Sequence, residues 1–306
     1  MKPSVCLLLS AALVALGPGV CHAQRGMPAP TPETAKSWLI EAMAAKDKGA
    51  LLNLLGSDAK DIVNSGDPTF DDFMLGKLSD AAAKQCVIDQ WDQDTVFFNI
   101  GPNSWRMPIP LEKTDAGWVF NPNYDKKQIL QKRIRRNQSN AVEVCRAFVN
   151  GQQLYSQRDH NKNNVRDYAQ KFISTTGKRD GLYWPQASPA DDASPLGPLV
   201  EKARERGYGP PEPGEETVYQ GYVYRILTSQ ESEAQGGARS YVIDGNMTGG
   251  FALVCWPAKY GDSGQLTFIV NQSGRVLQKD LGAQTADAVK QITSYNPDAS
   301  WAAANL

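Results

Sequence analysis

The chain has 306 residues, of which 41% are hydrophobic and 21% charged, with 32 basic and 33 acidic side chains. This near-neutral charge argues against a nucleic-acid partner, because binding to phosphates needs a basic stripe that releases counterions. The composition is that of a globular protein and specifies no chemistry.

The first 23 residues have the pattern of a secretory signal peptide. Lys2 supplies a positive charge, residues 5–16 are apolar but too short to span a bilayer, and small residues precede a cut after Ala23. We therefore expect a periplasmic or secreted protein of 283 residues that does not span the membrane after cleavage. It would keep one histidine, His160, which excludes a zinc site with several histidine ligands.

A short linker is expected at residues 24–30, and an N-terminal α+β domain at residues 31–124. Thr31 and Pro32 are typical of a helix start, and further helices are predicted at residues 48–55 and 71–84. Alternating segments then predict a small antiparallel sheet, with strands at residues 95–100, 105–111 and 118–120. This order of elements is similar to that of the cystatin and nuclear-transport-factor-2 folds.

Residues 125–306 are expected to form a second domain, in which a long helix packs on an antiparallel β-meander. Apolar residues recur at helical spacing from residue 125 to about 158, and a short helix is predicted at 198–206. Strands are predicted at residues 218–227, 241–243, 251–256, 266–270 and 276–279. Residues 251–256 are apolar on both faces, so we place them centrally, with the helix on one side.

An oxygen-rich loop follows the long helix. Asp159, Asn161, Asn163 and Asp167 stand at nearly alternate positions, and the carbonyl of Val165 falls between them. Such spacing suits a weak calcium site, the only cofactor that the sequence suggests. The alternative is a solvated turn whose side chains cap backbone groups.

Residues 174–185 gather charges, glycines and aromatic rings in one segment. Its side chains suit a binding lip for a small ligand or for a protein of the cell envelope. The alternative is a structural role, with Arg179 paired to Asp180 and the aromatic rings closing the end of the sheet. The candidate ligand-binding residues are Lys178, Arg179, Asp180, Tyr183 and Trp184.

Three cysteines remain after cleavage, and an exported protein meets an oxidising compartment. Cys145 is expected on the core face of the long helix and Cys255 on the strand beneath it, so a Cys145–Cys255 disulfide is geometrically feasible, with Cys86 free. Three buried, reduced thiols are the alternative.

A basic cluster at residues 132–136 lies on the first turns of the long helix. It suits either an anionic partner or a solvated helix face.

Motifs spread along the chain resemble an exported bacterial family, domain of unknown function 2950. The resemblance rests on segments that include Ser65-Gly-Asp67, Trp105-x-x-Pro108-x-Pro110, residues 176–185, residues 194–199 and Tyr222-x-Tyr224. It covers the mature chain and implies export. The C-terminal half also resembles the globular part of type IV pilins and pseudopilins, in which a helix crosses an antiparallel sheet and some members bind calcium.

Two functions follow from these observations. The histidine poverty and the lack of a nucleophile–base pair predict a non-enzymatic binding or envelope-scaffold module. The alternative is a hydrolase of envelope material that works through Asp159, Asp167 and Asp180, because carboxylates can perform acid–base chemistry without histidine.

Overall fold

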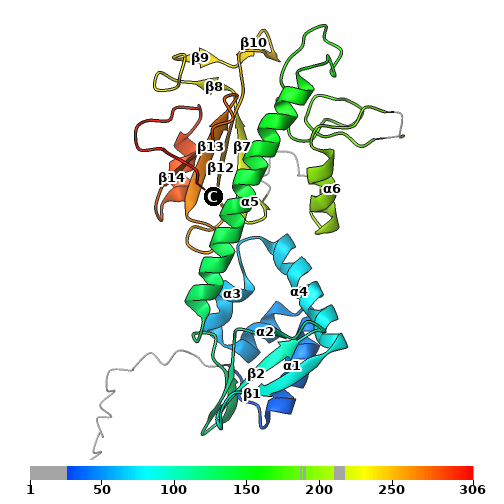
Figure 1. The fold of residues 1–306 in the computed structure, drawn as a ribbon, viewed down its shortest axis with the longest axis vertical. Helices are drawn as coiled ribbons and strands as arrows, with labels where there is room; N and C mark the ends of the chain where they lie inside the picture. The colour runs from blue at the N-terminus through cyan, green and yellow to red at the C-terminus, as the bar shows by residue number, and fades with distance from the viewer. Residues whose placement is uncertain (1–25, 187, 189–190, 210–217, 306) are drawn as a thin grey trace, which may run out of the picture.

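The computed structural model describes residues 26–186, 188, 191–209 and 218–305. Within them the buried apolar side chains form two separate cores, one drawn from residues 29–120 and the other from residues 141–295. One long helix, α5 (Lys126–Tyr155), runs from the first unit to the second (Figure 1). The predicted α+β class is confirmed, whereas the signal peptide of residues 1–23 lies outside the described residues.

Capping side chains begin the N-terminal helices. Thr31 caps α1 (Pro32–Ala44), and Asp47 caps α2 (Lys48–Leu55), each by accepting a hydrogen bond from a backbone N–H of the first turn. The short η1 (Ser57–Ala59) and α3 (Lys60–Val63) follow. Asp67 then caps α4 (Pro68–Lys84), which begins three residues before the predicted start.

These helices cover one face of an antiparallel sheet. Its strands run in the order β1-β2-β4-β5, with β3 paired to β2. Val96, Phe98 and Ile100 of β2 alternate onto the helical side and are buried there. The bounds are β1 (Cys86–Gln90), β2 (Thr95–Ile100), β3 (Trp105–Arg106), β4 (Leu111–Thr114) and β5 (Gly117–Phe120).

The prediction for this unit needs three corrections. The strand predicted at residues 105–111 is interrupted, since β3 ends at Arg106 and β4 begins at Leu111, with Pro108 and Pro110 between them. The prediction also contained no strand at β1, whose residues are mostly half-buried and show no clear apolar alternation. The described part of the expected linker is also packed, because Ala29 is buried and exchanges two 2.8 Å backbone hydrogen bonds with Trp118. Ala29 therefore pairs with the free edge of the N-terminal sheet.

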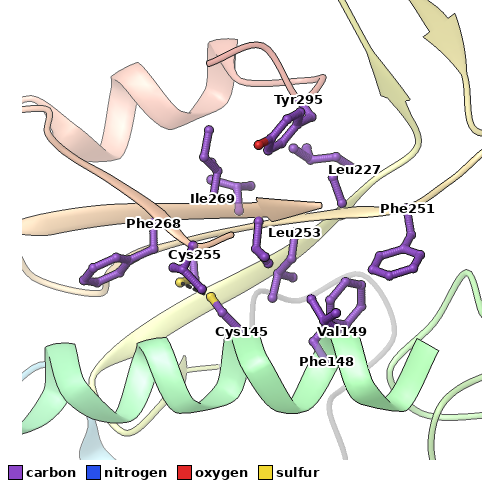
Figure 2. Packing of buried hydrophobic residues seen from close by; sticks show 14 of the residues in the cluster. Cys145, Phe148, Val149, Leu227, Phe251, Leu253, Cys255, Phe268, Ile269 and Tyr295 are labelled. Atoms are coloured by element: carbon purple, nitrogen blue, oxygen red, sulfur yellow. Dashed lines mark hydrogen bonds between the residues drawn. The ribbon is translucent and has the colours of Figure 1, made fainter. Parts of the chain in front are cut away.

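The C-terminal sheet has the strand order β15-β14-β13-β12-β7-β6, with every neighbouring pair antiparallel. Its central strand β12 (Ala252–Pro257) is buried at all six positions, as predicted for residues 251–256. In Figure 2, Cys145, Phe148 and Val149 project from α5 toward this sheet, while Ile269 and Tyr295 lie beyond it. The other strands are β6 (Val218–Tyr219), β7 (Tyr222–Leu227), β13 (Leu266–Asn271), β14 (Leu277–Asp280) and β15 (Ala302–Ala303).

The single strand predicted at residues 218–227 is two strands joined by a tight turn. Gln220 and Gly221 both have positive φ, 52° and 80°, so the chain reverses there and β6 pairs back onto β7. Smaller elements surround the sheet, namely α6 (Gly197–Glu205), β8 (Ser229–Gln230), β9 (Arg239–Ser240), β10 (Val242–Ile243), β11 (Asn246–Met247), α7 (Thr285–Ala288) and η2 (Val289–Gln291).

The basic cluster at residues 132–136 joins the two units. The Arg133 guanidinium donates 2.6 Å hydrogen bonds to the carbonyls of Asp61 and Ile62, and Arg136 lies 4.7 Å from the centre of the Phe70 ring. Burial lowers the pKa of both arginines. Arg133 is half-buried against the N-terminal unit, whereas Lys132, Arg135 and Arg136 are exposed, as expected of a solvated helix face.

Candidate functional site

A cavity of about 240 Å³ opens between α5, α6 and the edge of the C-terminal sheet. Its wall is mostly apolar, and five aromatic rings contribute to it. Such a volume lies below the range of about 300–1,000 Å³ that is usual for drug-sized ligands, so it suits a small molecule. The lining residues are Val144, Phe172, Ile173, Tyr183, Leu196, Leu199, Val200, Ala203, Arg204, Tyr208, Gly209, Tyr219 and Tyr224.

The cavity wall opposite the sheet is formed where backbone segments pack closely. The two arms of residues 171–183 pair with each other, and the start of α6 packs against them. A side chain at Gly181 would lie 2.7 Å from the amide nitrogen of Ser174, so glycine allows the two arms of the 171–183 segment to pair. The Tyr183 amide then donates to the Phe172 carbonyl at 2.8 Å, which sets both rings beside the cavity. The Leu196 amide donates to Leu182 at 3.0 Å and fixes the start of α6 against this segment.

Two tyrosines of the sheet edge end in buried hydroxyls without a hydrogen-bond partner among the described residues. These are Tyr219 of β6 and Tyr224 of β7. The Gln220 side chain acts on the Tyr219 phenol as a hydrogen-bond donor and lowers its pKa, and no acceptor for the Tyr219 proton lies among the described residues. Burial is the larger effect and raises the pKa of both phenols, so each keeps its proton. An unpaired buried hydroxyl costs about 1–3 kcal/mol.

Tyr208 connects the cavity to the N-terminal unit. Its ring lines the cavity, and its hydroxyl donates a 2.6 Å hydrogen bond to Oδ2 of Asp67. The same oxygen accepts from the Gly221 amide at 2.9 Å, while Oδ1 accepts from Phe70. Burial raises the pKa of Asp67, although these hydrogen bonds act in the opposite direction. One wall of the cavity is therefore held by a carboxylate of the other unit.

Arg204 is the one cationic side chain among the lining residues of the cavity. Its residue is exposed, and its guanidinium lies 5.0 Å from the centre of the Tyr183 ring. The charge therefore remains near solvent while the guanidinium covers an aromatic face.

The structure separates the five residues that were predicted to bind a ligand, and only Tyr183 lines the cavity. Asp180 accepts hydrogen bonds from the Lys171 ammonium and from Thr175, which lower its pKa to about 2 against the effect of burial. Arg179 pairs with Asp192 at 3.6 Å and not with Asp180, so the pairing suggested in the structural alternative is absent. Lys178 is exposed, in the turn that joins Thr175 to Asp180.

The remaining predicted residue, Trp184, belongs to an aromatic cluster at the end of α5. The His160 ring lies 4.9 Å from the centre of the Tyr155 ring and 5.1 Å from that of Trp184. Burial is the main cause of a lowered pKa at His160. The Tyr155 hydroxyl donates to the Arg179 carbonyl at 2.6 Å and ties this cluster to the loop.

The oxygen-rich loop folds around its own backbone. The Asp159 carboxylate accepts from the amides of Asn163 and Asn164 at 3.1 and 2.8 Å, and the Asn163 side chain accepts from the Val165 amide. The side chains of Asn161 and Asn163 donate to Asp167. This arrangement is the capped turn that the sequence analysis offered as the alternative to a calcium site, and the two alternatives differ in their response to calcium.

The carboxylates proposed for hydrolysis lie away from the cavity, since none of Asp159, Asp167 and Asp180 is among its lining residues. Burial raises the pKa of Asp167 and a salt bridge holds Asp180. Across the described residues, no three His, Cys, Asp or Glu side chains gather in a way that could hold a metal ion.

Cys145 and Cys255 face each other in the second core, with their sulfur atoms 3.6 Å apart and both side chains fully buried (Figure 2). The three cysteines among the described residues are thiols in this structure, and Cys86 is half-buried in the other unit. The predicted pair is thus brought together, and the disulfide itself stays a prediction.

Sequence reasoning missed most of the cavity. The sequence indicates no shared site for Phe172, Tyr208, Tyr219 and Tyr224, of which the last two fall in the strand predicted at residues 218–227. The available signal was the tyrosine-rich edge at residues 219–224, together with the motif segments at 176–185 and 194–199. What joins them is the packing of α6 beside α5, which no local pattern specifies.

The model of one protein family, described as protein of unknown function (DUF2950), matches residues 28–304. No curated protein and no solved structure matches the chain. The likenesses to pilins, cystatins and nuclear transport factor 2 are therefore not confirmed. Among the described helices, none is long and apolar enough to cross a membrane.

Proposed function

The chain belongs to the DUF2950 family, and we propose that it is an exported, non-enzymatic binding protein that holds a small apolar molecule in the cavity beside α5. The apolar cavity, with five aromatic rings in its wall, is the observation that carries this proposal. Small-molecule sites are typically concave and apolar with a few polar groups that orient the ligand. The hydrolase alternative has less support, because Asp159 and Asp180 hold the backbone of the loops that contain them.

Binding is tested with 1-aminonaphthalene, an apolar fluorophore whose emission rises in a dry site. The wild-type protein used in this test begins at residue 24. The variant Ala203→Phe places a phenyl ring at a position that lines the cavity. Lys202→Phe adds the same ring to the neighbouring exposed position of α6 and serves as control.

We expect the wild type and Lys202→Phe to bind the fluorophore and Ala203→Phe to lose most of this binding, with similar melting temperatures for all three. No binding by the wild type, or equal binding by Ala203→Phe, would contradict the proposal.

Export is tested separately with the full chain in a Gram-negative host. The expected product is a periplasmic or secreted protein whose first residue is Gln24, because Ala23 and its neighbours form the predicted cleavage site. A cytoplasmic product that still begins at Met1 would contradict export and would leave the cavity proposal standing.

A further inference from the structure

We infer that the ligand of this cavity is an aromatic monocarboxylate, whose rings lie among the apolar side chains beside α5 and whose carboxylate pairs with Arg204. The inference rests on the proposed function and names the class of ligand. Three observations carry it, namely the position of Arg204, the charges around the rest of the wall and the aromatic rings in that wall.

Arg204 is placed to receive an anion. It stands in the last turn of α6, and it both lines the cavity and is exposed, so its charge lies where the cavity meets solvent. The centre of the Tyr183 ring is 5.0 Å from the guanidinium, and this cation–π contact holds the group over the wall of the cavity.

The guanidinium of Arg204 has no anionic partner of its own. Arg158 and Arg179 both pair with Asp192, whereas Arg204 forms no ion pair and no side-chain hydrogen bond among the described residues. Glu201 lies one turn earlier on the same helix and does not pair with it. A guanidinium presents its N–H donors in a planar fork that matches the two oxygens of a carboxylate. The open fork therefore favours a carboxylate as the polar end of the ligand.

The charges around the cavity place that polar end at Arg204 and not deeper in the site. Asp67 accepts the hydrogen bond of the Tyr208 hydroxyl, so an anion beside that hydroxyl would be repelled. Near the sheet edge, the charge of Arg206 is opposed by those of Asp67 and Glu143. A carboxylate at Arg204 also stays close to water and avoids the desolvation cost of a buried ion.

The wall favours a ring system as the apolar body. Phe172, Tyr183, Tyr208, Tyr219 and Tyr224 contribute five aromatic side chains to it. The hydroxyls of Tyr219 and Tyr224 are buried, so these two residues offer the ligand their rings. Aromatic rings attract other rings in offset or edge-to-face geometry beyond the effect of area alone. A rigid ring also loses less conformational entropy on binding than an alkyl chain of the same size.

The test compares 2-naphthoate with 2-naphthamide, which have the same rings and nearly the same shape but differ in charge. Isothermal titration at low ionic strength measures the affinity of both for the chain that begins at residue 24. Arg204→Gln removes the charge, and Arg204→Lys keeps the charge without the planar fork. Lys202→Gln is the matched control, because it removes the same charge from an exposed position of α6 that does not line the cavity.

We expect the wild type and Lys202→Gln to bind 2-naphthoate about fivefold more tightly than 2-naphthamide, the ratio that a well-formed ion pair near solvent provides. In Arg204→Gln this ratio should fall to one or below through weaker naphthoate binding alone, and Arg204→Lys should keep an intermediate ratio. The ratio in the wild type should also decrease as salt is added, since exposed charges are screened.

Equal affinity of the wild type for the two compounds, or tighter binding of the amide, would overturn this inference and leave the cavity as a site for neutral molecules. A preference for naphthoate that survives in Arg204→Gln would overturn it as well. Equal weakening of both compounds in Arg204→Gln would assign Arg204 a packing role only and would also overturn it. If neither compound nor 1-aminonaphthalene binds the wild type, the proposed function is refuted and the inference with it.

Discussion

Tyr208 donates a 2.6 Å hydrogen bond to Asp67, two buried side chains that lie 141 residues apart in the chain. The bond connects the first turn of α4 in the N-terminal unit with the wall of the cavity in the C-terminal unit. The Tyr208 hydroxyl also accepts from the Gln220 amide at 3.0 Å, so it lies in a continuous network across the junction. The first prediction concerns this network.

Replacing Tyr208 by Phe should lower the free energy of unfolding by about 1–3 kcal/mol at pH 7, because it leaves a buried carboxylate with one donor fewer. Asp67 has a raised pKa in the folded protein, so its contribution is most favourable below its unfolded pKa of about 3.9 and declines as pH rises. Loss of the Tyr208 donor raises this pKa further. The variant should therefore lose more stability at pH 7 than at pH 4.

Urea unfolding at the two pH values measures this difference. Tyr260→Phe removes an exposed tyrosine–aspartate bond of 3.2 Å and should change stability by less than about 0.5 kcal/mol at both. A loss in Tyr208→Phe that is the same at pH 4 and pH 7 would contradict the role assigned to the Asp67 charge.

Gly221 is predicted to be irreplaceable at the same junction. A Cβ atom there would lie 2.4 Å from Nδ2 of Asn137, whose amide donates to the Ser263 carbonyl at 2.9 Å. Gly221→Ala should cost at least about 2 kcal/mol, of which roughly 1 kcal/mol is the strain of positive φ. Gly245 has the same φ of 80° with open space around it, so Gly245→Ala reports the strain alone. Equal losses in the two variants, measured by urea unfolding, would show that the clash is relieved without cost.

Cys145 and Cys255 are predicted to form a disulfide when the chain matures in an oxidising compartment. Their sulfur atoms need to approach by about 1.5 Å to reach the bond length of a disulfide. A chain from residue 24 should then show one reactive thiol after denaturation without reductant and three after reduction. The Cys86→Ser variant should show no reactive thiol after denaturation without reductant and two after reduction. Three thiols in the unreduced wild type would support the alternative of buried, reduced cysteines.

The oxygen-rich loop is predicted to be insensitive to calcium, because both oxygens of Asp159 already accept backbone amides. Thermal melts in millimolar calcium and in chelator should share one midpoint, with magnesium as the control for ionic strength. A ligand that binds only the folded state must raise its stability. A higher midpoint in calcium alone would therefore restore the metal site, with Asp159 and Asp167 as its first ligands to mutate.

Much of the fold could be predicted from local patterns. The bounds of α2 and β2 were predicted to the residue, since Gly56 ends the helix and the β-branched and aromatic run of the strand stops at the turn that begins with Gly101. The central position of β12 followed from its continuous apolar run. By contrast, the turn at residues 220–221 was missed, because Gln220 gives no signal of its positive φ.

The sequence by itself determined the α+β class, the long helix, the meander and the family, because these depend on periodicity and on motifs within short stretches. Only the tertiary structure decided that Arg133 and Arg136 join the two units, and that tyrosines from three segments surround one cavity. The physical reason is that these contacts depend on how α5 and α6 lie against the sheet. That packing is settled by the fit of side chains distant in sequence, such as Cys145 with Cys255 and Asp67 with Tyr208.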